Sequence, residues 1–99
     1  MDDLKNGELI EKIKKRIRIM SDTSDEEIDD LIESCRIELE MSGVYGDETD
    51  PTYCQAIVLY CKANYGYDED AERFGMAFAS LRDAMSLSGD YRKKEGGEN

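Results

Sequence analysis

Hydrophobic residues recur every three or four positions in separate stretches of the chain, which is the spacing of amphipathic helices. In the first stretch the apolar positions fall on one arc of a helical projection, whereas most of the lysines and arginines between them lie outside it. The members of that arc are Leu9, Ile10, Ile13, Ile17 and Met20. This pattern predicts a helix from about Gly7 to Met20 that buries one face.

A second helix is predicted from its start signal. Ser24 is placed as the N-cap and Glu27 three residues later completes a capping box, while acids in the first turn favour the positive end of the helix dipole. Gly43 supplies a left-handed end. One stripe of this helix is apolar and consists of Ile28, Leu31, Ile32, Cys35 and Leu39. Ile37 and Met41 lie on the opposite side, four residues apart, so an exposed apolar pair is expected on an acidic face.

The third stretch is apolar on every side. Asp50 and Pro51 form a start signal, with Asp at the N-cap and Pro at the first helical position. From Tyr53 to Tyr65 no continuous polar face is visible, and Gly66 is expected to end the helix. A helix that is hydrophobic all round is a buried one, so we expect the other helices to pack around it.

The fourth helix is expected to run from about Glu69 to Leu87, with Asp68 as its cap and Gly89 as its end. Its apolar stripe is narrow and consists of Phe74, Phe78, Leu81 and Met85. Small residues that would allow another helix to approach closely are Ala71, Ala77 and Ala79.

Together these elements predict a single small all-α domain of about four helices. Ninety-nine residues correspond to one domain, and a composition of 39% hydrophobic and 37% charged residues with one proline suits helices with polar outer faces. We expect the helical domain to span residues 1–89. The segment 90–99 is polar and rich in glycine, so it is predicted to be a flexible C-terminal tail.

Charge is strongly segregated along the chain, which has a net charge of −11. Five positive charges and no acid fall within residues 12–18, whereas residues 22–50 hold twelve acids and one base, Arg36. A net negative chain is repelled by nucleic acid, which argues against sequence-specific DNA binding. The segregation either reflects two solvated surfaces or allows the basic helix of one subunit to meet the acidic segment of the next.

Residues that carry catalysis or metal binding are scarce. The chain has no histidine, its three cysteines (Cys35, Cys54 and Cys61) form no Cys-x-x-Cys pair, and its acids match no calcium-loop pattern. The cysteines are best interpreted as reduced thiols in the core, as in a protein of the cytoplasm without a signal peptide. No apolar run approaches membrane-spanning length. The sequence therefore predicts no catalytic site, no metal site, no cofactor and no membrane contact.

The order of elements resembles that of the head–tail connector (adaptor) proteins of long-tailed phages and prophages. The similarity rests on the capped second helix with Ile28, Leu31 and Ile32, on Asp50-Pro51 before an apolar helix, and on Phe74, Phe78 and Leu81-Arg82 before Leu87-Ser88. It extends over residues 5–92.

This resemblance implies a structural virion protein at the head–tail interface, which would reside in the host cytoplasm before assembly. Such a subunit is expected to form a ring, dodecameric in the virion, between the portal protein and the stopper or tail-completion protein, and to line the channel through which DNA passes. The alternative is a small acidic regulatory module that imitates DNA or inhibits a host protein. Residues expected at a subunit or portal interface are Lys12, Lys14, Lys15, Arg18, Ile37, Met41, Tyr91, Arg92, Lys93 and Lys94.

Overall fold

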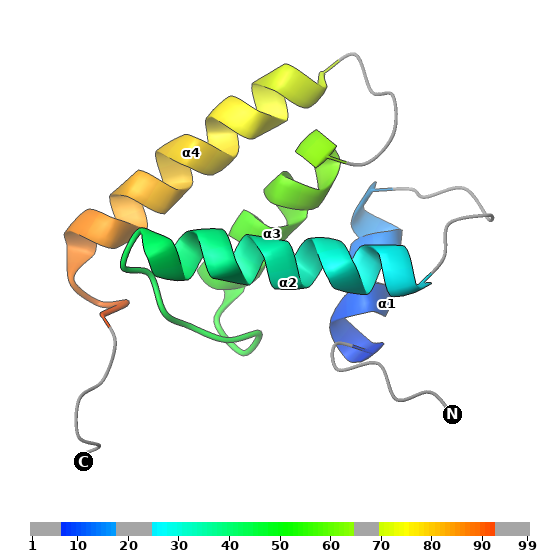
Figure 1. Cartoon of the computed structure of the whole chain (residues 1–99), viewed down its shortest axis with the longest axis horizontal. Coiled ribbons are helices and arrows are strands. Elements are labelled where there is room, and N and C mark those ends of the chain that lie inside the picture. The colour runs from blue at the N-terminus through cyan, green and yellow to red at the C-terminus, as the bar shows by residue number, and fades with distance from the viewer. Residues whose placement is uncertain (1–6, 18–24, 65–69, 93–99) are drawn as a thin grey trace.

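The structure is a computed structural model that describes residues 7–17, 25–64 and 70–92 (Figure 1). Four helices follow one another along the chain: α1 (Gly7–Ile17), α2 (Asp25–Met41), α3 (Pro51–Asn64) and α4 (Ala71–Ser88). Within these residues no strand occurs, which confirms the predicted all-α fold. Helix α1 lies beside the N-terminal end of α2, and α4 lies on the far side of α3 (Figure 1).

Helix α3 is the centre of this arrangement, as its sequence predicted. Helices α1, α2 and α4 all pack against it, and α1 also packs against α2. Its buried side chains are Tyr53, Cys54, Ala56, Ile57, Val58 and Cys61. Thr52 and Gln55 are exposed, so α3 keeps a strip toward solvent and is not covered on every side. Burying most of one helix allows three amphipathic helices to share a single hydrophobic core.

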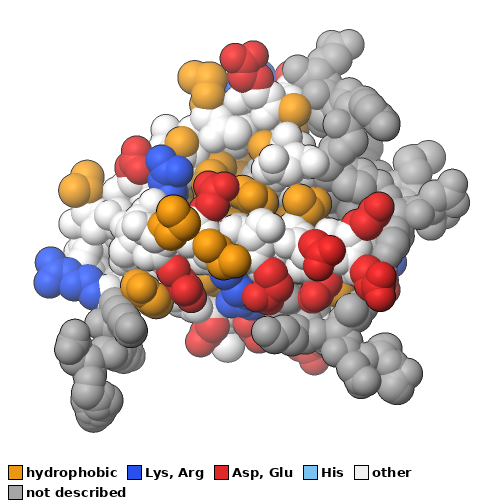
Figure 2. Space-filling model, in the orientation of Figure 1, with side chains coloured by type: hydrophobic (Ala, Val, Ile, Leu, Met, Phe, Trp, Pro, Cys, Tyr) orange, Lys and Arg blue, Asp and Glu red, His pale blue; other side chains and the backbone are white. Residues whose placement is uncertain are grey.

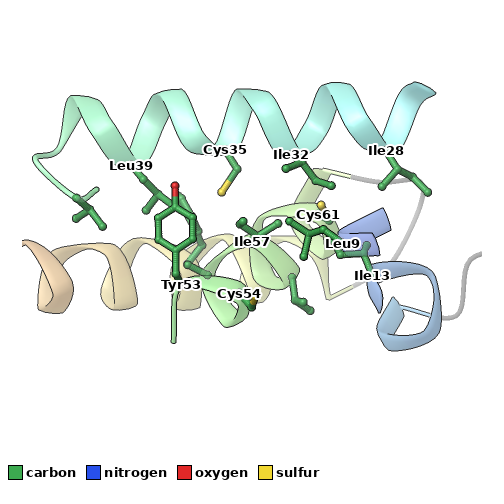
Figure 3. Packing of buried hydrophobic residues seen from close by; sticks show 14 of the residues in the cluster. Leu9, Ile13, Ile28, Ile32, Cys35, Leu39, Tyr53, Cys54, Ile57 and Cys61 are labelled. Atoms are coloured by element: carbon green, nitrogen blue, oxygen red, sulfur yellow. The ribbon is translucent and has the colours of Figure 1, made fainter. Parts of the chain in front are cut away.

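The inner faces of α1 and α2 close one side of this core. Leu9, Ile10 and Ile13 of α1 are at most 3% exposed, so the predicted arc of that helix is confirmed as far as it is described. The predicted stripe of α2 is confirmed as well, since Ile28, Ile32, Cys35 and Leu39 are fully buried and Leu31 is half-buried. Figure 3 shows Ile32 and Cys35 pointing from α2 toward Ile57 and Cys61 of α3.

Local signals set three of the helix ends. The Asp50 carboxylate accepts a hydrogen bond of 2.9 Å from the backbone N–H of Thr52, which satisfies a donor in the first turn of α3. Gly43 and Gly89 take left-handed φ angles of 85° and 82° directly after α2 and α4, as predicted. The predicted cap Ser24 and the predicted stop Gly66 lie outside the described residues.

Two details of α4 differ from the prediction. The residue at its N-cap is Asp70, so the predicted cap at Asp68 is wrong, and the helix begins at Ala71, two residues after the approximate start predicted at Glu69. No side-chain capping bond is made by Asp70, whose carboxylate instead forms an ion pair of 3.4 Å with Arg73 one turn later.

The side chains of α4 follow the predicted pattern, with one exception. Ala77, predicted to allow close helix packing, is exposed. Phe78 and Met85 are buried as predicted, because they are the members of the stripe that face α3 most directly.

The segment after α4 is held against the domain. The backbone N–H of Tyr45 donates a 2.6 Å hydrogen bond to the carbonyl of Tyr91, and the Tyr91 side chain packs on the core. Nearby, Gly46 permits close contact with the Tyr53 ring, because a Cβ at this position would lie 2.7 Å from ring carbon Cδ1. The folded body therefore includes Tyr91, two residues beyond the predicted boundary, while residues 93–99 lie outside the described part of the chain.

The buried stripe of α4 can be tested by truncating Phe78, which is 5% exposed. Phe78→Ala is expected to lower the free energy of unfolding by about 3–5 kcal/mol, because it removes a buried ring and leaves a cavity. Met76→Ala is the matched control on the same helix, since Met76 is 67% exposed and its loss should change stability little. Urea unfolding of both variants measures the difference, and equal effects would contradict the orientation of α4.

The buried thiols predict a loss of stability at alkaline pH. Burial raises the pKa of the Cys61 thiol to about 12, above the value of roughly 8.5 expected in the unfolded chain. The folded state therefore favours the neutral thiol. Its contribution to the free energy of unfolding is fully present below about pH 8.5 and is lost as the pH rises toward 12.

In that window the ionisation of Cys61 should make the free energy of unfolding fall by about 1.4 kcal/mol per pH unit. Cys61→Ala should abolish this part of the pH dependence. The measurement is urea unfolding of the reduced protein and the variant at several alkaline pH values. Identical slopes would show that Cys61 does not differ in ionisation between the two states.

Candidate subunit interface

Positive charge gathers on the outer face of α1. Lys12, Lys15 and Arg16 are exposed because the opposite face of this short helix is occupied by its buried leucine and isoleucines. The Arg16 guanidinium donates a hydrogen bond of 3.4 Å to the side-chain oxygen of Gln55 on α3. Lys12, Lys15 and Arg16, which we call the α1 basic patch, therefore remain available on the surface of the domain.

Lys14 has a different environment from the rest of the predicted basic set. Its ammonium lies 2.5 Å from the carboxylate of Asp25, the first residue of α2. The hydrogen bond to Asp25 raises the pKa of the Lys14 ammonium and ties α1 to the start of α2. Lys14 therefore joins two helices within one chain. Arg18, the fourth predicted cation, lies outside the described residues.

Helix α2 presents an acidic surface around a single cation. Arg36 lies 3.2 Å from Glu48 and 3.7 Å from Glu33, with its guanidinium carbon 5.8 Å from the centre of the Tyr53 ring. Burial opposes the charge of Arg36, but its hydrogen bond to Glu48 and the surrounding negative groups outweigh burial and raise its pKa. Because Arg36 is engaged in these contacts, the exposed surface of α2 is predominantly negative.

Two hydrophobic side chains interrupt this acidic surface. Ile37 is 57% exposed and Met41 is 81% exposed, which confirms the outward direction predicted from their spacing. Figure 2 shows hydrophobic side chains lying among the acidic side chains over α2. An apolar pair within a charged surface is the composition expected of a surface that another protein covers.

A groove of about 500 Å³ separates α2 from α4. It exists because both helices pack on α3 but diverge from each other across it (Figure 1). Tyr60 and Phe78 meet edge to face at its base, with ring centres 5.2 Å apart. The α2 wall carries Glu38, while the α4 wall is lined by Ala71, Glu72, Gly75, Ala79 and Arg82. We call this feature the α2–α4 groove.

The C-terminal candidates are divided between the folded body and the segment beyond it. Tyr91 is half-buried, and its hydrogen bond with Asp50 raises the pKa of its hydroxyl. Arg92 is exposed at the edge of the domain, beside the loop that joins α2 to α3. Lys93 and Lys94 lie outside the described residues. Of these four, only Arg92 therefore offers an exposed positive charge on the described surface.

Sequence reasoning missed the α2–α4 groove and two exposed hydrophobic residues on α4. Met76 is 67% exposed and Leu87 is 86% exposed. Their separation of eleven residues, about three helical turns, places them on one side of α4. This spacing is visible in the sequence and could have predicted a second apolar line beside the stripe from Phe74 to Met85. No sequence signal marked the groove, because its walls come from helices that meet only in the folded chain.

Neither a cluster of metal ligands nor a membrane-spanning helix is found among the described residues. Across residues 7–17, 25–64 and 70–92, no group of three or more cysteine, aspartate or glutamate side chains is arranged to hold a metal ion. None of the four described helices is both long enough and apolar enough to cross a bilayer.

Comparison with known proteins identifies the family. The model of the phage connector protein family matches residues 9–92, which includes α1 from its third residue, the whole of α2, α3 and α4, and Tyr91. No curated protein and no solved structure matches the chain. The resemblance seen in the order of the helices is confirmed by this match, and the chain belongs to the phage connector protein family.

Proposed function

We propose that this chain is a structural head–tail connector subunit that forms a ring between the portal protein and the stopper or tail. Membership of the phage connector family supports a structural, non-enzymatic role. The ring is expected to be dodecameric in the virion and to surround the channel through which DNA passes. Free subunits would be present in the host cytoplasm before assembly.

The observation that carries this proposal is the separation of opposite charges on different parts of the fold. The α1 basic patch lies on one helix, and the acidic surface with Ile37 and Met41 lies on another. A closed ring requires two different surfaces on each subunit, one meeting the other on the next copy. Charge complementarity between the two surfaces favours that contact and disfavours pairing of like with like.

The excess of acid also suits a channel for DNA. With a net charge of −11, the acidic surface of each subunit would repel the phosphate backbone. Weak affinity for phosphate is an advantage in a channel, because bound DNA would have to break those contacts to move. We propose that part of the acidic surface faces the channel.

The C-terminal segment is proposed as a contact with the portal. Tyr91 anchors the end of the domain, and Arg92, Lys93 and Lys94 follow it as three consecutive positive charges. A short polar segment of this kind can become ordered when it binds, so that its ordering entropy is lost only on assembly.

Charge reversal tests the interface. Lys12→Glu or Lys15→Glu is expected to weaken subunit association about tenfold or more, because each substitution places like charges together. Arg73→Glu is the matched control, since Arg73 is also exposed and lies on α4, outside both surfaces. Light scattering coupled to size-exclusion chromatography and negative-stain microscopy, with and without the cognate portal, give the assembly state.

Rings that disappear in the α1 variants and persist in the Arg73 variant would support the proposal. Rings unaffected by either α1 substitution would remove the electrostatic interface. A wild-type protein that remains monomeric and ignores the portal would instead favour the acidic regulatory module.

A further inference from the structure

We propose that the α2–α4 groove is the surface that receives the α1 basic patch of a second copy of this chain. This assignment rests on the proposed ring function and adds the identity of the receiving site. The acidic segment as a whole could supply many partners for a basic helix. The groove is favoured over the N-terminal half of α2 by its shape and its apolar content, and because Asp25 and Glu33 in that half already form ion pairs with cations, whereas Glu38 accepts only a long hydrogen bond from the Tyr60 hydroxyl.

The acids in the N-terminal half of α2 already have interactions within the chain. Asp25 binds Lys14, and Glu33 binds Arg36. Glu26, Glu27 and Asp29 are also engaged in polar or electrostatic interactions. A cation arriving at that half would compete with existing contacts, so its net gain would be small.

The groove offers acids together with apolar and aromatic surface. Glu38 and Glu72 stand on its opposite walls, and Glu38 accepts a long hydrogen bond of 3.4 Å from the Tyr60 hydroxyl. Ile37 and Met41 are exposed on α2, one residue before and three residues after Glu38. Arg82, the one cation among the described residues that line the groove, lies 3.2 Å from Asp83, which offsets part of that charge. The groove thus combines a negatively charged rim with apolar surface, whose burial by a partner would contribute favourable free energy.

The α1 basic patch has the chemistry that this groove can bind. Lys12, Lys15 and Arg16 are spaced three and four residues apart, so they share one side of α1 within about 6 Å along the axis. Their long aliphatic stems can cover Ile37 and Met41 while the charged ends reach the glutamates. The base of the groove suits cations too, because an aromatic ring attracts a guanidinium, as Phe78 does with Arg82 at 5.9 Å.

The geometry of the fold makes this contact directional. Helix α1 packs on α2 and α3, whereas the groove is formed with α4 on the other side of α3. One copy can therefore present its α1 basic patch to a neighbour while its own groove receives another. Direct pairing of two α2 surfaces is disfavoured, because both are acidic and like charges repel.

A charge-swap experiment on the full chain tests the assignment. The patch variant carries Lys12→Glu and Lys15→Glu, and the groove variant carries Glu38→Lys and Glu72→Lys. A control variant carries Asp30→Lys and Glu40→Lys, which makes the same charge change on exposed positions of α2 that do not line the groove. Light scattering measures association in about 0.1 M salt, where the Debye length is about 10 Å, and circular dichroism checks helicity.

The patch and groove variants are each expected to lose association by about tenfold or more, while the control retains it within about threefold. An equimolar mixture of the patch and groove variants should recover association. In the mixture, the reversed, acidic α1 patch of the patch variant meets the reversed, basic groove of the groove variant. The unchanged basic patch of the groove variant meets the unchanged acidic groove of the patch variant. The chain that combines all four substitutions should recover it alone, with the net charge of the wild type.

The outcomes separate this assignment from the ring proposal. If the wild type associates and the groove variant associates equally well, or if only the control variant fails, the groove is not the receiving site and the ring proposal stands. Failure of both the mixture and the combined chain to recover association also overturns the assignment. A wild type that stays monomeric at every concentration overturns the proposed self-assembly and the assignment with it.

Discussion

The central position of α3 is the constraint on which the rest of the structure depends. Each of the other helices has one apolar face, and each contacts α3. The core therefore consists of one layer of side chains around α3, with Ile57 and Cys61 meeting Ile32 and Cys35 from α2 (Figure 3). Because a domain of this size buries a limited share of its surface, loss of this common partner would leave three amphipathic helices without a core.

The central position of α3 also explains why basic and acidic residues lie on separate surfaces. Every helix other than α3 turns its polar face outward, so the basic residues of α1 and the acids of α2 become separate surfaces of a thin domain. The same packing leaves α2 and α4 apart and creates the groove between them. Core formation and the proposed interfaces are therefore linked, since the groove and the charged surfaces are both consequences of arranging helices around one buried element.

The ion pairs of Lys14 and Arg36 illustrate why the contacts of surface charges are harder to predict from sequence than the members of the core. Lys14 and Lys15 are neighbours in a basic run, yet Lys14 contacts Asp25 and Lys15 is exposed. Arg36 appears in the sequence as an isolated cation among acids, and folding places it against Glu48 and the Tyr53 ring. Sequence spacing gives the side of a helix on which a charge lies, but its partner comes from another element.

The sequence by itself determined the number and order of the helices, the central place of α3, the outward direction of Ile37 and Met41, and the family, because periodicity and helix-end signals act over a few residues. The tertiary structure alone decided which cations are engaged, how Tyr91 is held by the loop at Tyr45, and where the α2–α4 groove opens. Those features depend on the angles and separations at which helices cross. Such quantities arise from side-chain packing between distant segments and leave no local pattern in the chain.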